Sequence, residues 1–306
     1  MSDFSSNFWS LYVAIITAVG IVACLLLLVI TARKKVKATA QNTTGHVWDG
    51  DLTEMNNPMP RWWMWLFVIT IVFGLGYLAL YPGLGSYAGQ KGWTSAGNYQ
   101  NEVNEAAKAL APVYARFDGM DTEKLAQDPQ AMAIGERLFM NNCAQCHGSD
   151  ARGSKGFPNL TDGDWLHGGT PENIHETITK GRIGVMPPMA AAVGSAEDVR
   201  NLAQYVLSLS GSPSDSLRAS LGKSKFTACA ACHGPTGKGN PLVGAPNLTD
   251  DIWLHGWGEA AIVAMINNGK TNQMPAQEGK LTEQQINVLT AYVWGLSNRP
   301  AATAAK

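Results

Sequence analysis

Two short runs of the sequence combine two cysteines with a histidine at a fixed spacing. The runs are Cys143-Ala144-Gln145-Cys146-His147 and Cys229-Ala230-Ala231-Cys232-His233. In c-type haem attachment, the two thiols of such a run add to the porphyrin vinyl groups, and the histidine that follows binds the iron. A single helical turn presents all three groups to one macrocycle. The sequence therefore predicts two covalently bound haem c groups.

Other sites that contain C-x-x-C pairs explain these runs less well. A zinc site made of four cysteines usually closes a short loop, whereas these two pairs lie far apart in the chain. A redox dithiol of the thioredoxin kind would lie in a βαβ pattern, which is missing around both pairs, and it would not need the histidine. Haem attachment accounts for every residue type in both runs.

The sixth ligand of each iron decides between an electron carrier and a reactive centre. Met186 and Met274 are each followed by proline, which favours an extended backbone suited to holding a thioether across a haem face. Histidine-methionine ligation raises the reduction potential and leaves no open position on the iron. Met189 is an alternative to Met186, but it lacks both the following proline and a counterpart later in the chain.

Histidine ligands and ligands from the other half of the chain are further alternatives. His167 and His255 recur in two Trp-Leu-His-Gly runs, so His167 is the second candidate for the sixth ligand of the first haem. The other expected role of this pair is to line the pocket and hydrogen-bond a haem propionate or the backbone. The methionine of one half could also reach the haem of the other half. Ligation within each half is sterically simpler and is our expectation. His46 and His175 are expected to be ordinary surface or interface histidines.

The segment that contains these residues is an internal repeat. Residues 158–162 and 246–250 both read Pro-Asn-Leu-Thr-Asp, and a glycine stands five residues before each Met-Pro pair, at Gly181 and Gly269. Tyr205-Val206 matches Tyr292-Val293 in the same order. Because the motifs recur in the same order and at similar spacing, the two halves are two copies of one domain.

Each half is expected to fold as helices around a haem. The first helices begin near Ala131 and Ser216 and end at the haem motifs. Apolar residues at helical spacing predict middle helices that end at Gly181 and Gly269. The last helices are expected to begin at Ser195 and Thr282, each followed three residues later by a capping partner. No strand alternation separates them, which predicts an all-α class.

Two apolar stretches in the N-terminal part are long enough to cross a bilayer. Uncharged residues run from about 8 to 32 and from about 62 to 81, and a membrane-spanning helix needs roughly 20 residues. Tryptophans at one end of the second stretch and tyrosines at the other are typical of interfacial belts. The sequence therefore predicts a two-helix transmembrane hairpin in contact with membrane lipid. The first stretch is too long for a cleaved signal peptide, and Cys24 within it is expected to serve as a small apolar residue.

The distribution of basic residues predicts the orientation of the hairpin. The segment between the stretches carries Arg33, Lys34, Lys35 and Lys37, whereas no lysine or arginine precedes the first stretch. Since cytoplasmic loops collect basic residues, we expect both termini and the haem domains in the periplasm of a bacterium. The formal net charge of −1 gives no indication of nucleic-acid binding.

With these features together, the chain resembles the membrane-anchored dihaem subunit of cbb3-type cytochrome c oxidases, which are C-family haem-copper oxidases. The resemblance covers nearly the whole chain and rests on the hairpin, the two haem motifs and residues 46–52 and 57–63 between the helices. It implies two tandem class I cytochrome c domains with Cys143, Cys146, His147 and Met186 around one haem, and Cys229, Cys232, His233 and Met274 around the other.

The resemblance also implies the partners and the role in respiration. Electrons would come from a periplasmic donor cytochrome c and pass, through a monohaem cytochrome c subunit, to a catalytic haem-copper oxidase subunit that reduces oxygen. This chain has no candidate copper ligands and no histidine in its apolar stretches, so we expect no oxygen-reducing centre in it. The competing functions are a dihaem peroxidase and a haem-based gas sensor, both of which need an open iron.

The expected organisation has four parts. Residues 1–82 form the hairpin with its short cytoplasmic loop, and residues 83–128 form a periplasmic linker with a short helix between Asn101 and Arg116 that breaks near Pro112. Residues 129–211 and 212–300 form the first and second cytochrome c domains.

Overall fold

The structure is a computed structural model that describes residue 4, residues 6–33 and residues 42–298 of the 306-residue chain. Lys34, Lys35 and Lys37, on which the predicted orientation partly depends, lie outside the described residues. The chain divides into two compact units, and the boundary falls between Ala109 and Leu110.

The N-terminal unit contains two apolar helices. α1 (Asn7–Arg33) and α2 (Arg61–Leu80) are both long and apolar enough to cross a membrane, and each end lies within one residue of its predicted position. Leu28 is the only buried residue of α1, and α2 has none, so most of their apolar surface is not covered by the described part of this chain. Uncovered apolar surface of this extent is what a helix surrounded by lipid presents.

A β-hairpin lies in the connection between these helices. β1 (Thr43–Trp48) pairs antiparallel with β2 (Leu52–Met55), and Asp49-Gly50 makes the turn with φ angles of 50° and 90°. Positive φ at both positions is the conformation for which Asp-Gly is preferred in tight hairpins. Glu54 accepts hydrogen bonds from the Trp48 indole at 2.9 Å and from the Thr44 hydroxyl at 3.0 Å.

The predicted linker contains a long helix. α3 (Ser95–Ala115) begins earlier than expected and continues past Pro112, so the predicted break at that proline is wrong. Pro112 removes a single backbone donor, and the helix ends within its next turn, so few bonds are lost. The short helix α4 (Thr122–Leu125) follows.

The second unit contains two series of elements in a similar order, one for each repeat. The first series is α5 (Pro129–Asn142), α6 (Ala144–His147), α7 (Pro171–Lys180), β3 (Arg182–Met186), α8 (Ala190–Val193) and α9 (Ala196–Leu209). The second series is α10 (Ser216–Lys223), a 3-10 helix (Ser224–Ala228), α11 (Ala230–His233), α12 (Glu259–Asn268), β4 (Lys270–Met274) and α13 (Glu283–Asn298). The helix-rich prediction is confirmed.

The predicted helix ends are also confirmed. Ser195 and Asp198 form a capping box at the start of α9, and Thr282 and Gln285 do the same before α13. Gly181 and Gly269 end α7 and α12 with φ angles of 69° and 66°, which glycine adopts without strain.

Short strands modify the all-α prediction. β3 and β4 pair antiparallel, with Gly184 opposite Asn272 at the centre and Met186 opposite Lys270 at one end. The two residues at the centre occupy equivalent places in the two repeats, so the ladder has local twofold symmetry. Five-residue strands of mixed polarity give too short a pattern to be recognised from periodicity.

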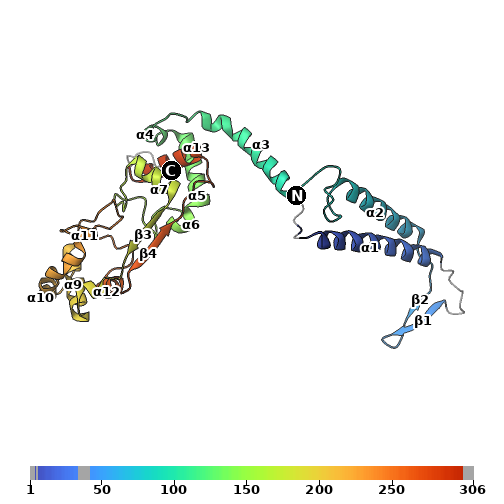
Figure 1. Cartoon of the computed structure of the whole chain (residues 1–306), viewed down its shortest axis with the longest axis horizontal. Coiled ribbons are helices and arrows are strands. Elements are labelled where there is room, and N and C mark those ends of the chain that lie inside the picture. The colour runs from blue at the N-terminus through green and yellow to red at the C-terminus, as the bar shows by residue number, and fades with distance from the viewer. Residues whose placement is uncertain (1–3, 5, 34–41, 299–306) are drawn as a thin grey trace. The chain divides into compact units, whose positions relative to one another are not determined.

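Packing divides the second unit into two lobes that do not follow the sequence repeats. In the first lobe, α13 packs against α4, α5 and α7, and in the second lobe, α9 packs against α10 and α12 (Figure 1). The last helix of each repeat has therefore been exchanged. The predicted domains 129–211 and 212–300 remain visible as sequence repeats, but each lobe is built from helices of both.

Two equivalent glycines allow the exchanged helices to cross closely. A Cβ on Gly135 of α5 would lie 2.6 Å from the Cβ of Tyr292 in α13. A Cβ on Gly222 of α10 would overlap the backbone of Asn201 and Leu202 in α9. Each of these glycines therefore allows a close crossing with a helix of the other repeat.

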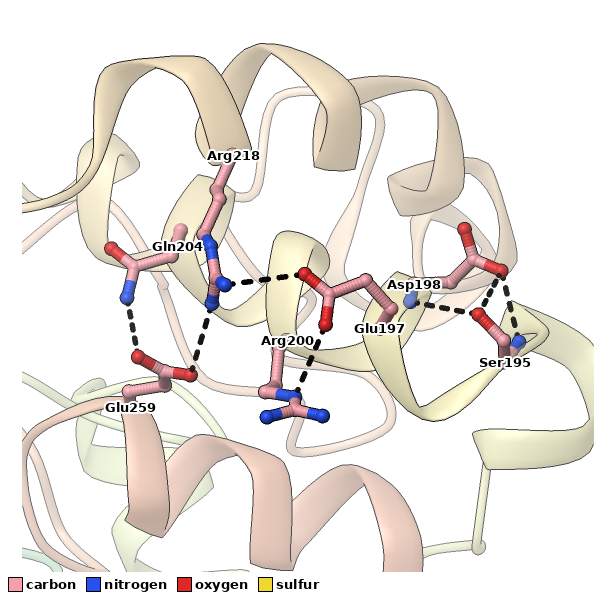
Figure 2. Close-up of polar contacts among 7 residues, drawn as sticks. All are labelled: Ser195, Glu197, Asp198, Arg200, Gln204, Arg218 and Glu259. Atoms are coloured by element: carbon pink, nitrogen blue, oxygen red, sulfur yellow. Dashed lines mark hydrogen bonds and ion pairs between the residues drawn. The ribbon is translucent and has the colours of Figure 1, made fainter.

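Polar side chains join the two repeats within the second lobe (Figure 2). Arg218 of α10 lies 3.3 Å from Glu197 of α9 and 4.0 Å from Glu259 of α12. The buried Gln204 of α9 donates to Glu259 at 2.7 Å and accepts from the backbone N–H of Asp215 at 2.8 Å. Both polar ends of Gln204 are therefore paired with residues of the second repeat, as a buried amide requires.

Candidate haem sites

The first motif begins at the end of α5. Cys143 follows the last residue of that helix as its C-cap and is also the N-cap of α6, and His147 ends α6 in a buried position. The Nδ1 atom of His147 lies 3.0 Å from the carbonyl oxygen of Pro158. Because a carbonyl can only accept, Nδ1 carries the proton and Nε2 keeps its lone pair for a metal.

The second motif has the same geometry. His233 is buried, and its Nδ1 atom lies 3.0 Å from the carbonyl oxygen of Pro246. Cys229 stands where Cys143 stands in the first repeat, at the junction with the short helix α11. The two carbonyls orient both histidines as neutral ligands, which is the arrangement that haem iron needs.

Sequence reasoning did not identify these two carbonyl groups. Pro158 and Pro246 each begin a repeated Pro-Asn-Leu-Thr-Asp segment, but that repetition was used only to align the halves. The recurrence of the Pro-Asn-Leu-Thr-Asp segment 11 and 13 residues after the two histidines was the signal that could have found them.

The cysteine environments disagree with a redox dithiol. Burial raises the pKa of the Cys143 thiol to about 11, with the neighbouring Cys146 as the second cause. Burial likewise raises the pKa of Cys229, with Cys232 as the second cause. Redox dithiols need a lowered thiol pKa to supply thiolate, whereas the pKa values of Cys143 and Cys229 are raised.

The two cysteine pairs also do not form a joint metal site. Within the described part of the chain, no three histidine, cysteine or acidic side chains come together closely enough to hold a metal ion. The buried histidine, its fixed tautomer and the two thiols of one helical turn instead fit a covalently bound haem c in each lobe.

The two candidate methionine ligands lie at the ends of the β3-β4 ladder. Met274 is partly buried and packs against the core of the first lobe, which also contacts Cys143. Met189 packs against the core of the second lobe together with Cys229. Met186 ends β3, opposite Lys270. Met274, and Met189 as the alternative to Met186, thus each pack against the lobe whose haem motif belongs to the other repeat.

His167 and His255 are engaged in contacts at the boundary between the lobes. The amide nitrogen of Asn272 lies 2.9 Å from Nε2 of His255 and donates to it. The ring of His167 lies against Gly244 and is hydrogen-bonded to the backbone of Pro241. Burial lowers the pKa of both histidines, and nearby cations lower it further, so both rings favour the neutral form.

The remaining histidines form ordinary contacts. His175 of α7 lies 3.1 Å from Glu283 of α13, which adds another contact between the repeats. The exposed His46 lies 3.5 Å from Glu54 in the β-hairpin. Cys24 of α1 is exposed and borders a hollow between α1 and α2.

Comparison with protein families identifies two matching segments. Residues 40–88 match the family described as "N-terminal domain of cytochrome oxidase-cbb3, FixP". Residues 130–206 and 221–293 each match the family described as "Cytochrome C oxidase, cbb3-type, subunit III". The double match agrees with the internal repeat and places a haem motif in each segment.

Individual relatives are similar over most of the chain. A cbb3-type cytochrome c oxidase subunit CcoP of Rubrivivax gelatinosus is 62% identical over 304 residues, which is 99% of this chain and 100% of that protein. A FixP subunit of Azorhizobium caulinodans is 41% identical over 84% of this chain and 93% of its own length. A CcoP subunit of Cereibacter sphaeroides is 39% identical over 83% and 94%.

Proposed function

The chain belongs to the family of CcoP and FixP subunits of cbb3-type cytochrome c oxidase, and from that premise we propose how its parts carry electrons. It is a membrane-anchored electron-transfer subunit with covalently bound haem c, and other subunits of the oxidase are its partners. The comparisons give no support to a peroxidase or a gas sensor.

We propose that the chain carries two haem c groups, one in each lobe. Cys143, Cys146 and His147 hold one, and Cys229, Cys232 and His233 hold the other. The observation that carries this proposal is the pair of equal histidine-carbonyl bonds, both 3.0 Å, beside the two cysteine motifs. The bound group supplies one-electron redox chemistry, and the chain's part is to fix the histidine tautomer and to enclose the group in an apolar core.

Methionine is the proposed sixth ligand of both irons, with Met186 and Met274 as the residues. His255 is less suitable because Asn272 donates to its Nε2, the atom that would bind iron. His167 is less suitable because its ring is bonded across the lobe boundary. With thioether ligation, neither iron has an open position, which suits electron transfer and excludes peroxide or gas binding.

The proposed path of electrons runs from a periplasmic donor cytochrome c, through the two haems and a monohaem cytochrome c subunit, to the catalytic haem-copper subunit. α1 and α2 are the proposed transmembrane hairpin in the bacterial inner membrane, with both termini and both lobes on the periplasmic side. Support comes from the length and apolar surface of the helices and from the basic residues between them. These helices hold the lobes at the membrane surface, where the donor arrives.

The orientation is testable with single-cysteine variants of the full chain that also carry Cys24→Ala. Asn98→Cys, in exposed α3, is expected to react in intact spheroplasts with a maleimide that cannot cross membranes. His46→Cys, in the exposed hairpin, is expected to react only after the membrane is opened. The haem-bonded cysteines do not react because thioethers have no free thiol. Labelling of position 46 from outside would contradict the proposed orientation.

A further inference from the structure

The loop that follows each candidate methionine is fastened to a helix of the other repeat. After Met274, the backbone N–H groups of Gln277 and Glu278 donate to the carbonyls of Ile178 and Thr179 at 3.0 and 3.2 Å. These carbonyls belong to α7 of the first lobe. After Met186, the N–H of Met189 donates to the carbonyl of Ile266 in α12 at 2.8 Å. Both loops are therefore held against the lobe opposite to their own repeat.

At the two capping glycines, too, the backbone that contains each methionine lies close to a helix of the other repeat. A Cβ on Gly181, which ends α7, would collide with the carbonyl of Met274 and the nitrogen of Ala276. A Cβ on Gly269, which ends α12, would collide with the carbonyl of Met186 and the nitrogen of Pro188. The methionine backbone of one repeat thus packs on the helix end of the other, twice and with equivalent atoms.

The lobe cores agree with the backbone contacts. Met274 packs against the cluster that contains Phe139, Ile174 and Ile178, and Cys143 packs against the same cluster. In the second lobe, the first-repeat residue Met189 packs against the cluster that also contacts Cys229. No described contact of this kind brings Met274 to the core of the second lobe.

We propose that the two haem ligands of each iron come from different repeats. Met274 serves the iron held by His147, and Met186 serves the iron held by His233. The proposal rests on the histidine-methionine ligation proposed above and replaces our expectation of ligation within each repeat. The exchange of α9 and α13 carries each methionine loop, through β3 or β4, into the opposite lobe.

Four double variants of the full membrane-bound chain test the pairing while leaving all haem cysteines in place. They combine His147→Ala or His233→Ala with Met186→Ala or Met274→Ala. The readout is the ferric charge-transfer band of an iron-thioether bond, to which we expect the two wild-type haems to contribute equally. If both substitutions remove ligands of the same iron, half of the band remains. If they remove ligands of different irons, the whole band is lost.

The proposal predicts that half of the band survives in His147→Ala with Met274→Ala and in His233→Ala with Met186→Ala. It predicts complete loss in the other two combinations. The opposite pattern would establish ligation within repeats. If Met186→Ala alone leaves the full band, Met186 is not a ligand, and the proposal is overturned for the second haem.

The readout does not require the altered lobe to remain folded, because the band that survives comes from the other haem. A redox titration gives an independent count, because one transition at the wild-type potential should survive in the same-iron pairs and none in the others. A different observation would contradict the proposed function itself. This would be a wild-type chain with fewer than two haems, or one without the thioether band.

Discussion

Replacing Cys143 and Cys146 together by alanine is expected to reduce the covalent haem content from two groups per chain to one. The sulfur atoms are the only covalent links in the proposed site, so His147 alone cannot retain the porphyrin under denaturing conditions. The measurement is haem staining on a denaturing gel, combined with the intact mass of the subunit. Electron delivery to oxygen by the complete oxidase should fall as well, because one carrier is missing from the path.

Two matched variants control this experiment. Cys229→Ala with Cys232→Ala should also leave one haem, whereas Cys24→Ala should leave two because Cys24 lies in the apolar helix α1. Retention of two haems after loss of the first cysteine pair would disprove the assignment. A loss of haem in the Cys24 variant would equally disprove it.

Gly222→Ala is expected to destabilise the second lobe by about 3 kcal/mol, near the upper end of the usual cost of overpacking a core. The added Cβ meets the backbone of Asn201 and Leu202, which cannot turn aside as a side chain can. For a unit of this size, about 1 kcal/mol corresponds to about 2–4 °C, so Tm should fall by roughly 6–12 °C. Thermal unfolding of the detergent-solubilised chain, followed by haem absorption, measures the change.

Gly163→Ala is the matched control for this variant. It makes the same chemical change at a loop glycine that has no neighbouring atom within 4 Å. Its Tm should lie close to that of the wild type. An unchanged Tm for Gly222→Ala would mean that α10 and α9 do not cross at this glycine, and the exchanged packing would have to be abandoned.

The sequence predicted those features that depend on local chemistry. The capping residues Ser195 and Thr282 mark helix starts because their side chains bond to backbone three residues away. Gly181 and Gly269 mark helix ends because few other residues accept a positive φ. The two apolar helices were placed within one residue because the uncharged stretches of the sequence mark their extent.

The helix exchange could not be predicted in the same way. α9 and α13 begin with the same kind of cap and carry equivalent tyrosines, Tyr205 and Tyr292, so either helix has the features needed to pack against either lobe. The choice between them depends on long-range contacts, such as Gln204 with Glu259, that no local pattern specifies. The break expected at Pro112 is wrong for a different reason. Proline usually interrupts a helix, but here it removes only one backbone hydrogen bond, and the helix continues.

The most direct test of the account is the reaction of the reduced full chain, expressed without the other oxidase subunits, with carbon monoxide. If both irons have histidine and methionine ligands, the ferrous spectrum is low-spin and carbon monoxide leaves it unchanged at neutral pH. Binding of carbon monoxide to either haem would reveal an open iron and contradict an electron carrier with closed coordination at both sites.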